Sequence, residues 1–309
     1  MEGAMEIEKL DIYNAKSGKF VTSLYGLKTI SSILEVKHSV NLQKSVLKPE
    51  RQEVRLEQKG KGLKDEQTLG ELGVKDKDGR LYVKDLGPQM GWSTVFVCEY
   101  AGPLFIYLWV FQRPWLLYGD DAALKPVSLC TQVAAGCWTV HYTKRLLETK
   151  LVHRFSHATM PLFNLFKNCT YYWGFSLYVA YHINHPLFTP PPLYQTYSAL
   201  AMFVVCEVGN LSIHLALRNL RPPGTKERRV PYPNSNPLTM LFQTVSCPNY
   251  TYEVGAWVAF TVMTQCIPAG MFAVCGFYQM AMWAVGKHRN YIKDFKNYPK
   301  RKAIIPFIL

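Results

Sequence analysis

The hydrophobic pattern divides the chain into two parts. Up to about residue 87, apolar and polar residues alternate in short stretches, as they do in the strands of a small soluble domain. Beyond residue 92, long apolar runs follow one another between short polar connectors. A run of about 20 apolar residues is long enough for a helix to cross a bilayer. We therefore predict a cytosolic domain at 1–87 and a polytopic, all-α membrane domain at 88–309.

The first domain is predicted to have a β-grasp layout. Two alternating stretches flank Ala15–Gly18, as in a hairpin, and residues 29–40 begin a helical stripe with Ile30, Ile33 and Leu34. Strands are expected at 53–56 and 80–84, and the stretch 55–86 resembles ubiquitin. Because this part shows no catalytic constellation, we interpret it as a docking or cap domain.

The second domain is predicted to contain about six to seven helices. Spans are expected at 93–112, 126–143, 168–186 and 194–217. The apolar stretch 254–285 is too long for one span, and Pro268 and Gly270 in its middle predict a helical hairpin. The shorter apolar run Leu238–Val245 is expected to be a re-entrant or additional short span.

The distribution of charge predicts the topology. The formal net charge is +13, and connectors 144–167, 218–229 and 287–302 are basic, whereas 184–193 contains no Lys or Arg. The positive-inside rule then places the first domain, the basic connectors and the C-terminus in the cytosol. Cations in short loops beside apolar spans favour anionic lipid or a phosphate-bearing ligand over nucleic acid.

Short motifs exclude several kinds of site. The eight cysteines form no CxxC pair, and GxGxxG after a strand, GxxxxGK[ST] and HExxH are all absent. A nucleotide would therefore have to bind between helices. His153 and His157 lack a third ligand in the sequence, so we interpret them as connector residues and predict no metal site.

Two residues within apolar runs are candidates for chemistry. Glu99 lies one helical turn before Pro103, and an acid inside a span is costly unless it faces protein or a wet cavity. Tyr142 lies near the end of the second span. It is either part of the interfacial aromatic belt or a proton donor that faces a polar cavity.

A second group of polar residues is arranged on helical faces. Asn210, His214 and Arg218 are spaced i, i+4, i+8, with Arg221 three residues further, and should line a cavity. The arginines either bind phosphate oxygens or anchor the helix at the membrane surface. Asn249 either caps a helix or joins Glu253 in holding a carboxamide.

The C-terminal tail begins with a similar pattern. Lys287, Tyr291 and Asp294 share a face if the segment is helical, and His288 follows Lys287. The alternative to a ligand site here is a solvated segment that binds lipid headgroups.

Longer stretches resemble the steroid 5α-reductase family, and within it the very-long-chain trans-2,3-enoyl-CoA reductases or their reductase-like sister branch. They include EYAGPLFIYL, HYTKRLLETKLVHRFSHATMPL, GNLSIHLALRNLRPPG, SCPNYTYEVGAW and the C-terminal KHRNYIKDFKNYPKRKAIIPFIL. The resemblance implies an endoplasmic-reticulum membrane enzyme that reduces long-chain trans-2-enoyl-CoA with NADPH in fatty-acid elongation. It also implies elongase and dehydratase partners.

The resemblance assigns roles to the candidate residues. Glu99 matches an active-site acid, while Tyr142 and Tyr250 match two tyrosines that compete for the role of proton donor. The NADPH site is predicted from Asn210, Arg221, Arg229, Asn249, Glu253 and Tyr291, together with His214, Arg218, Lys287 and His288.

The chain departs from the family pattern at two positions. Phe163 stands where a basic residue is expected, and Glu207 stands where an amide is expected. Two other functions remain open from the sequence. One is reduction of another enone such as a 3-oxo-4-ene steroid, and the other is a non-catalytic membrane scaffold with a ubiquitin-like docking module.

Overall fold

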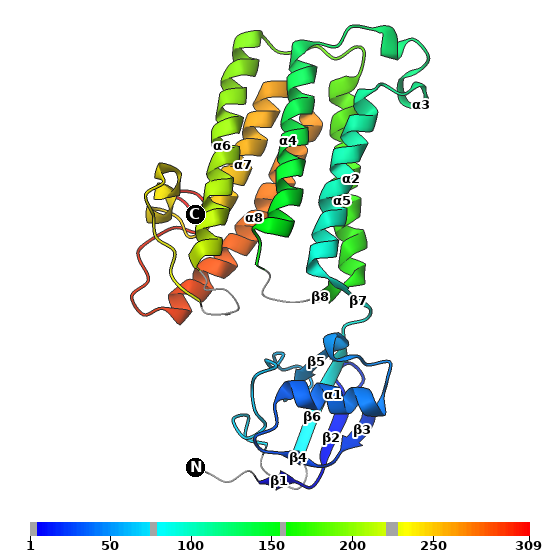
Figure 1. Ribbon diagram of the computed structural model, residues 1–309, viewed down its shortest axis with the longest axis vertical. Coiled ribbons are helices and arrows are strands. Elements are labelled where there is room, and N and C mark those ends of the chain that lie inside the picture. The colour runs from blue at the N-terminus through cyan, green and yellow to red at the C-terminus, as the bar shows by residue number, and fades with distance from the viewer. Residues whose placement is uncertain (1–4, 75–78, 155–158, 221–227) are drawn as a thin grey trace. The chain divides into compact units, whose positions relative to one another are not determined.

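A computed structural model describes residues 5–74, 79–154, 159–220 and 228–309 (Figure 1). The chain forms two compact units. One comprises Met1–Gly91 with His157–Asn164, and the other comprises Trp92–Ser156 with Leu165–Leu309. The first is built mainly on a sheet and the second mainly on helices, so the predicted fold class is confirmed.

The first unit is a β-grasp domain. Its main sheet has the order β3 (Phe20–Leu24), β2 (Leu10–Asn14), β6 (Gly79–Asp85) and β5 (Gln52–Arg55). The central pair β2–β6 is parallel, and the outer pairs are antiparallel. Helix α1 (Ile33–Gln43) connects the two halves of the sheet. The short strands β1 (Glu6–Ile7) and β4 (Leu27–Lys28) pair separately, as do β7 (Gln89–Gly91) and β8 (Thr159–Pro161).

The sequence pattern explains this core. Ile12, Val54 and Leu81 alternate with polar residues in their strands and are fully buried. The helix begins four residues later than predicted because Ser32 accepts a hydrogen bond from the backbone N–H of Glu35 and caps it. Leu34, which was counted in the predicted stripe, is exposed, whereas Ile33, Val36 and Val40 face the core.

The second unit contains six long helices within the described part of the chain. They are α2 (Trp92–Phe111), α4 (Leu129–Leu151), α5 (Leu162–Asn184), α6 (Leu193–Leu220), α7 (Pro248–Thr264) and α8 (Ile267–Asp294). They run side by side (Figure 1). Shorter elements are α3 (Trp115–Tyr118), η1 (Pro49–Arg51) in the first unit, η2 (Ala122–Leu124) and η3 (Pro237–Gln243). The expected short span at 238–245 is thus largely a 3-10 helix.

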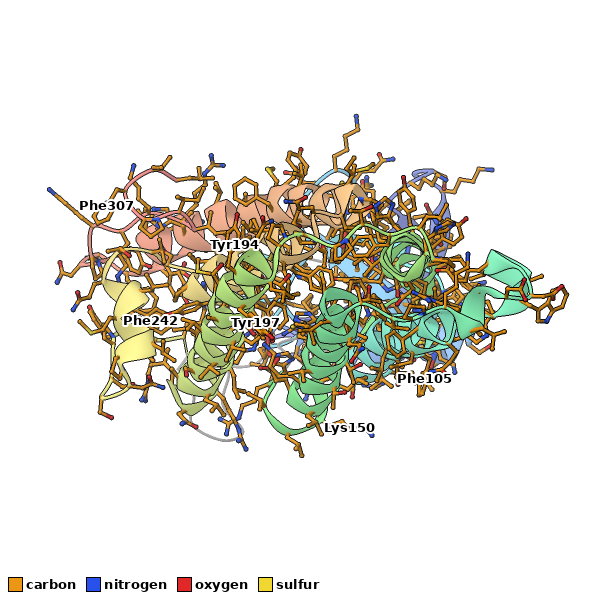
Figure 2. The ribbon with its side chains drawn as sticks, turned by 90° about the horizontal axis from the view of Figure 1, so that it is seen from above. Phe105, Lys150, Tyr194, Tyr197, Phe242 and Phe307 are labelled. Atoms are coloured by element: carbon orange, nitrogen blue, oxygen red, sulfur yellow. The ribbon has the colours of Figure 1, made fainter. Side chains whose placement is uncertain are left out.

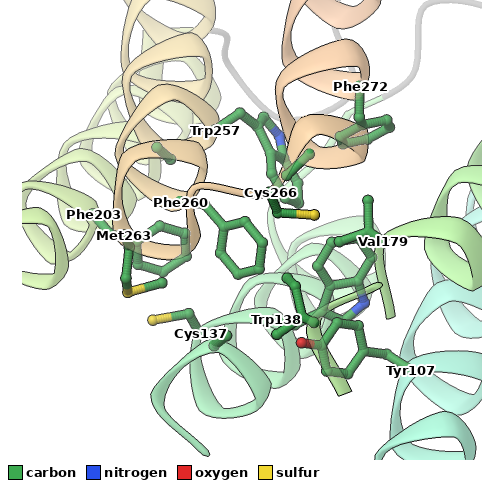
Figure 3. Close-up of a cluster of buried hydrophobic side chains, with 14 of the residues drawn as sticks. Tyr107, Cys137, Trp138, Val179, Phe203, Trp257, Phe260, Met263, Cys266 and Phe272 are labelled. Carbon is green, nitrogen blue, oxygen red and sulfur yellow. The ribbon is translucent and has the colours of Figure 1, made fainter. Parts of the chain in front are cut away.

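Three of these helices, α2, α6 and α8, are long and apolar enough to cross a membrane. Their large apolar residues include many exposed ones, such as Phe105 and Tyr197 (Figure 2). Other apolar side chains fill the interior, where Trp138 packs against Tyr107, Trp257 and Phe260 (Figure 3). A bundle with apolar residues both inside and outside is what a lipid environment requires.

The predicted hairpin at 254–285 is present, but it turns earlier than Pro268. Helix α7 ends at Thr264, and Gln265 adopts a left-handed conformation with φ of 47°. Pro268 then occupies the first turn of α8. Proline fits there because the N–H groups of a first turn have no partner within the helix.

Close packing joins α2 to α5. A Cβ atom on Gly102 would lie 1.9 Å from Nε1 of Trp173, so only glycine allows this approach. Trp173 Nε1 donates to the carbonyl of Cys98 over 3.1 Å, one turn before Pro103. The carbonyl of Pro103 accepts from Ser176 of α5 and from Trp138 of α4. These bonds fix the stretch of α2 that carries Glu99.

Candidate active site

Charged side chains from α4, α6 and α7 meet inside the helical unit. His141, Glu148, Glu207, Asn210 and His214 are all buried. Charged groups buried in a bundle are costly unless they pair with one another. Their arrangement therefore shows how each charge is compensated and which polar atoms remain for a ligand.

Glu207 of α6 is held by two bases of α4. Its Oε1 lies 2.7 Å from Nδ1 of His141, and its Oε2 lies 2.7 Å from Nζ of Lys144. The departure from the family pattern at this position thus has a structural explanation, since the carboxylate is neutralised by Lys144. Lys144 also donates to Oδ1 of Asn210 over 2.7 Å, which connects the pair to the predicted cofactor residues.

Asn210 connects α6 to α7. Its amide Nδ2 donates to the carbonyl of Asn249 over 2.9 Å and to Oε2 of Glu253 over 3.1 Å. The structure therefore brings together three residues that the sequence placed in the cofactor site. Asn249 does not cap α7, because the cap position is Cys247 and Asn249 lies in the first turn. That alternative for Asn249 is wrong.

The second carboxylate oxygen of Glu253 faces α4. Oε1 lies 3.9 Å from both Nε2 of His141 and Nε of Arg145, beyond hydrogen-bond distance. The side chain of Asn249 makes no hydrogen bond to another described residue. Glu253 and Asn249, spaced i, i+4, therefore offer an oxygen that accepts no hydrogen bond and a carboxamide that makes none within the described part of the chain, although the oxygen lies in the field of His141 and Arg145.

Arg145 is the central cation of this site. It donates to Oε2 of Glu148 over 3.0 Å and to the hydroxyl of Tyr100 over 2.8 Å. Its guanidinium also lies 4.9 Å from the centre of the Tyr100 ring. Arg145 thus joins Tyr100 of α2 to the network of α4, α6 and α7, and its field reaches Glu253.

Glu148 also pairs with His214, which lies next to His153. Its Oε1 lies 3.0 Å from Nδ1 of His214, whose ring packs edge-on against that of His153 at 4.9 Å. These three residues have the types of ligand that a divalent metal uses, although Arg145 already neutralises the carboxylate. Burial lowers the pKa of His153 to about 4, so the ring is neutral at pH 7. His157 lies outside the described residues.

Tyr142 lies in the core with a free hydroxyl. The residue is 1% exposed, and its ring packs against Trp138, His141 and Trp257. The hydroxyl makes no hydrogen bond within the described part of the chain. A buried hydroxyl without a partner is costly and suggests that a ligand completes it. This location excludes an interfacial belt residue.

Glu99 has a different environment. It is buried, and its Oε1 accepts a hydrogen bond from Nδ2 of Asn168 in α5 over 2.7 Å. Its neighbour Tyr100, rather than Glu99 itself, contacts Arg145. The predicted acid is therefore linked to the network through the next residue of α2.

Tyr250 and the α8 residues form a separate group. Lys287 donates to the Tyr250 hydroxyl over 2.9 Å and also lies 4.7 Å from the centre of that ring. His288 turns to another face, where its Nδ1 lies 2.7 Å from Oγ of Ser246. The ring of Tyr291 stacks on Tyr298 at 5.3 Å. Asn249 and Tyr250, adjacent in α7, thus face different groups.

The basic connector 218–229 contributes fewer contacts to the described site than α4, α6 and α7 do. Arg218 and Arg229 are exposed, and Arg221 lies outside the described residues. Arg228, another cation of the basic connector, pairs with Asp294 and lies 5.7 Å from the centre of the Tyr291 ring.

Sequence reasoning missed the α4 residues His141, Lys144, Arg145 and Glu148. The second span was expected to end at residue 143, whereas α4 continues to Leu151. A signal was present, since His141, Arg145 and Glu148 follow the spacing i, i+4, i+7 of one helical face.

The fold and the site define an integral membrane protein with a β-grasp domain and a polar site enclosed by helices. Residues 6–85 match a family model described as TECR, ubiquitin-like domain, and residues 158–309 match one described as 3-oxo-5-alpha-steroid 4-dehydrogenase. The chain is 53% identical to a probable very-long-chain enoyl-CoA reductase of Caenorhabditis elegans, over 97% of this chain and 99% of the nematode protein.

Two further relatives agree. The chain is 51% identical to a very-long-chain enoyl-CoA reductase of Dictyostelium discoideum, over 75% of each protein. It is 40% identical to a human trans-2,3-enoyl-CoA reductase-like protein, over 97% of this chain and 84% of the human protein. The chain therefore belongs to the very-long-chain enoyl-CoA reductase family, which confirms the resemblance found in the sequence.

Proposed function

We propose that the chain reduces long-chain trans-2-enoyl-CoA to saturated acyl-CoA with NADPH, the last step of fatty-acid elongation. Family membership makes it an oxidoreductase that acts on a carbon–carbon double bond. The choice of NADPH, the endoplasmic-reticulum location, the cytosolic termini and the elongase and dehydratase partners are further parts of this proposal.

The residues present fit a nicotinamide cofactor. A carboxamide ligand both donates and accepts hydrogen bonds, and the site offers Oε1 of Glu253, which accepts no hydrogen bond from the described residues, beside the side-chain carboxamide of Asn249. These two residues would hold the nicotinamide amide. The cations Lys287 and Arg229 would meet the phosphates, as would Arg221. When bound, NADPH supplies the hydride for C3 of the enoyl thioester.

The buried hydroxyl of Tyr142 carries the proposed mechanism. Hydride addition at C3 moves charge to the thioester oxygen, and a hydrogen-bond donor near that oxygen stabilises the enolate. A tyrosine is protonated at neutral pH, so Tyr142 can donate its proton to C2 and complete the reduction. The cation of Arg145, next to Tyr100, favours the developing negative charge. Glu99 would position α2 around this centre through its bond to Asn168.

Tyr250 is the less favoured donor because it lies with Lys287 and apart from the buried network, whereas the unpartnered hydroxyl of Tyr142 lies in the core. In this proposal it supports the cofactor side of the site together with Lys287. The two assignments make different predictions for the same pair of substitutions.

The test measures NADPH oxidation by the full-length chain with a long trans-2-enoyl-CoA. Tyr142→Phe should lower kcat by about 100-fold or more, the usual range for loss of a general acid. Tyr250→Phe should mainly raise the KM for NADPH. Tyr107→Phe is the matched control, because Tyr107 is also buried and packs on Trp138 but is given no role.

The outcomes for Tyr142→Phe and its control separate loss of a proton donor from loss of packing. Normal turnover in Tyr142→Phe would contradict the proton-donor assignment. A loss of turnover in Tyr107→Phe of the same size would show that the effect comes from packing. Since Tyr142 makes no hydrogen bond to the described residues, Tyr142→Phe should also leave the unfolding temperature unchanged or higher.

One observation supports a second candidate function. The match of residues 158–309 to the steroid 4-dehydrogenase model favours reduction of an enone that carries no coenzyme A. The chemistry would use the same residues. Turnover of a 3-oxo-4-ene steroid at a rate above that of the enoyl-CoA would identify this alternative.

A further inference from the structure

A cavity lies at the C-terminal end of α8, and Lys287 and Tyr291 are not among the described residues that line it. Its volume is about 600 Å³, and it is an open hollow lined by residues of α8, by the segment that follows α8, and by Gln243 and Thr244. Of the predicted cofactor residues, His288 alone is among the described residues that line it. The cavity thus needs an explanation beyond the nicotinamide site.

The ionisable side chains that line this cavity are mainly basic. Five basic side chains line it, and no acidic residue does so within the described chain. They are His288, Lys296, Lys300, Arg301 and Lys302. Lys296, Lys300 and Lys302 are exposed, and no carboxylate of the described residues pairs with them. Several uncompensated cations around one hollow attract an anion with more than one charge.

Arg301 strengthens this interpretation because it is buried. It is 8% exposed and donates to the carbonyl of Pro231 over 2.8 Å, while its Nε has no hydrogen-bond partner within the described chain. Its guanidinium lies 5.1 Å from the centre of the Tyr232 ring and 5.6 Å from that of Tyr298. The carbonyl and the two rings compensate part of this buried charge, and the unpartnered Nε leaves a donor that an anion could satisfy.

The cavity is held in place by the backbone. Lys302 donates its N–H to the carbonyl of Thr244 and accepts from the N–H of Ser246, each over 2.8 Å. The N–H of Cys247 donates to the carbonyl of Ala303 over 3.0 Å. The C-terminal cations are therefore fixed next to the start of α7, which carries Asn249 and Glu253.

Aromatic residues define the type of anion. Phe295, Tyr298 and Phe307 line the cavity together with the cations. Aromatic rings stack with nucleotide bases, while arginine and lysine bind phosphates. Rings and cations in one cavity favour a phosphorylated adenosine over a bare phosphate.

We propose that this cavity binds the phosphorylated adenosine head of the coenzyme A substrate. This inference rests on the proposed function, since that function supplies the acyl-CoA. The head would be held at the C-terminal segment, while the flexible pantetheine arm reaches into the helical unit. NADPH and an anionic lipid carry the same phosphate chemistry, and the test distinguishes them.

The experiment compares two thioesters of the same enoyl chain, one of coenzyme A and one of pantetheine, which lacks the adenosine phosphates. The variant is Lys300→Gln with Lys302→Gln, because exposed lysines can be replaced without unfolding the chain. Its KM for enoyl-CoA should rise roughly tenfold, as expected when charged hydrogen bonds are lost. Its KM values for enoyl-pantetheine and for NADPH should not change.

Lys293→Gln is the matched control, since Lys293 is an exposed lysine of α8 outside the cavity lining. It should leave all three KM values unchanged. An equal rise for both thioesters in the double variant, or a rise in the KM for NADPH, would overturn the proposal. So would an effect seen only in vesicles of phosphatidylcholine with phosphatidylserine and not in phosphatidylcholine alone.

Direct binding separates this proposal from the proposed function. Adenosine 3′,5′-bisphosphate should bind wild type and Lys293→Gln, and should bind the double variant roughly tenfold more weakly. If wild type reduced neither thioester but this binding pattern held, the proposed function would fail while the cavity assignment stood. Equal binding by wild type and the double variant would contradict the cavity assignment.

Discussion

The two units of this chain place their charges in opposite ways. In the β-grasp unit the ion pairs lie at the surface, as in Arg51–Asp85, whose side chains are 21% and 37% exposed. In the helical unit Lys144 and Glu207 are 13% and 7% exposed. The first arrangement is ordinary for a soluble domain, whereas the second concentrates charge where solvent is excluded.

The difference indicates where function lies. An exposed ion pair contributes little to stability, and a buried pair is often no more stabilising than apolar residues of the same size. A buried network therefore has to be explained by something other than stability. In the helical unit that network surrounds the free groups of Tyr142, Asn249 and Glu253, which is why we assign the chemistry there.

The largest effect is expected from breaking the buried network. Glu207→Ala would leave His141 and Lys144 buried without their acid, which should cost about 3–5 kcal/mol of unfolding free energy. Thermal unfolding of the full chain in detergent measures this loss.

Two further variants sharpen that comparison. Asp65→Ala removes an acid from the partly exposed Lys37–Asp65 pair and should change the unfolding of its unit much less. Glu207→Gln, which keeps a hydrogen-bond acceptor, should fall between the two. Equal losses in Glu207→Ala and Asp65→Ala would contradict the contrast between the units.

A smaller loss of stability is expected from adding a methyl group at Gly209, where α6 packs closely on α7. A Cβ atom on Gly209 would lie 2.4 Å from the ring of Tyr252, whose hydroxyl donates to the carbonyl of Leu238. Gly209→Ala should therefore cost about 1–3 kcal/mol, measured by thermal unfolding. Gly136→Ala is the control, because nothing lies within 4 Å of its added Cβ. A Gly209→Ala chain as stable as the control would contradict this packing.

The smallest change in stability is expected in the β-grasp unit, when acid protonates Asp85 of the Arg51–Asp85 pair. A hydrogen bond from Arg51 lowers the pKa of Asp85 from its ordinary value of 3.8. Because the folded pKa is depressed, the stabilisation is present above about pH 4 and is lost as the pH falls through the folded value. Asp85→Asn should thus differ slightly from wild type at pH 7, and the difference should shrink as the pH falls below the ordinary pKa of 3.8 and through the lower folded value. A difference that persists unchanged in acid would contradict the ion pair.

The sequence predicted the elements better than their mutual contacts. Apolar runs located α2, α4, α5 and α6, because the length of a span is a local property. The partners of Glu207 could not be predicted, since His141 and Lys144 are more than 60 residues away and a helical pattern does not determine which faces meet. The basic end of α4 was interpreted as a connector for the same reason.

Among the candidate residues, too, some groupings could be predicted from the sequence and others could not. Asn210, Asn249 and Glu253 were predicted together and do lie together. Tyr142 and Tyr250 were equivalent in the sequence, and the structure separates them only through their neighbours, a free hydroxyl in one case and Lys287 in the other. Such a distinction depends on tertiary packing.

The central claim is that the free groups beside the buried network bind the dinucleotide. The most direct measurement is the thermal unfolding of the full chain with and without NADPH, in wild type and in Asn249→Ala. A ligand at 100 times its Kd stabilises the folded state by about 2.7 kcal/mol, so NADPH should raise the wild-type unfolding temperature. The shift should largely disappear in Asn249→Ala. No shift in wild type, or an equal shift in the variant, would contradict this account.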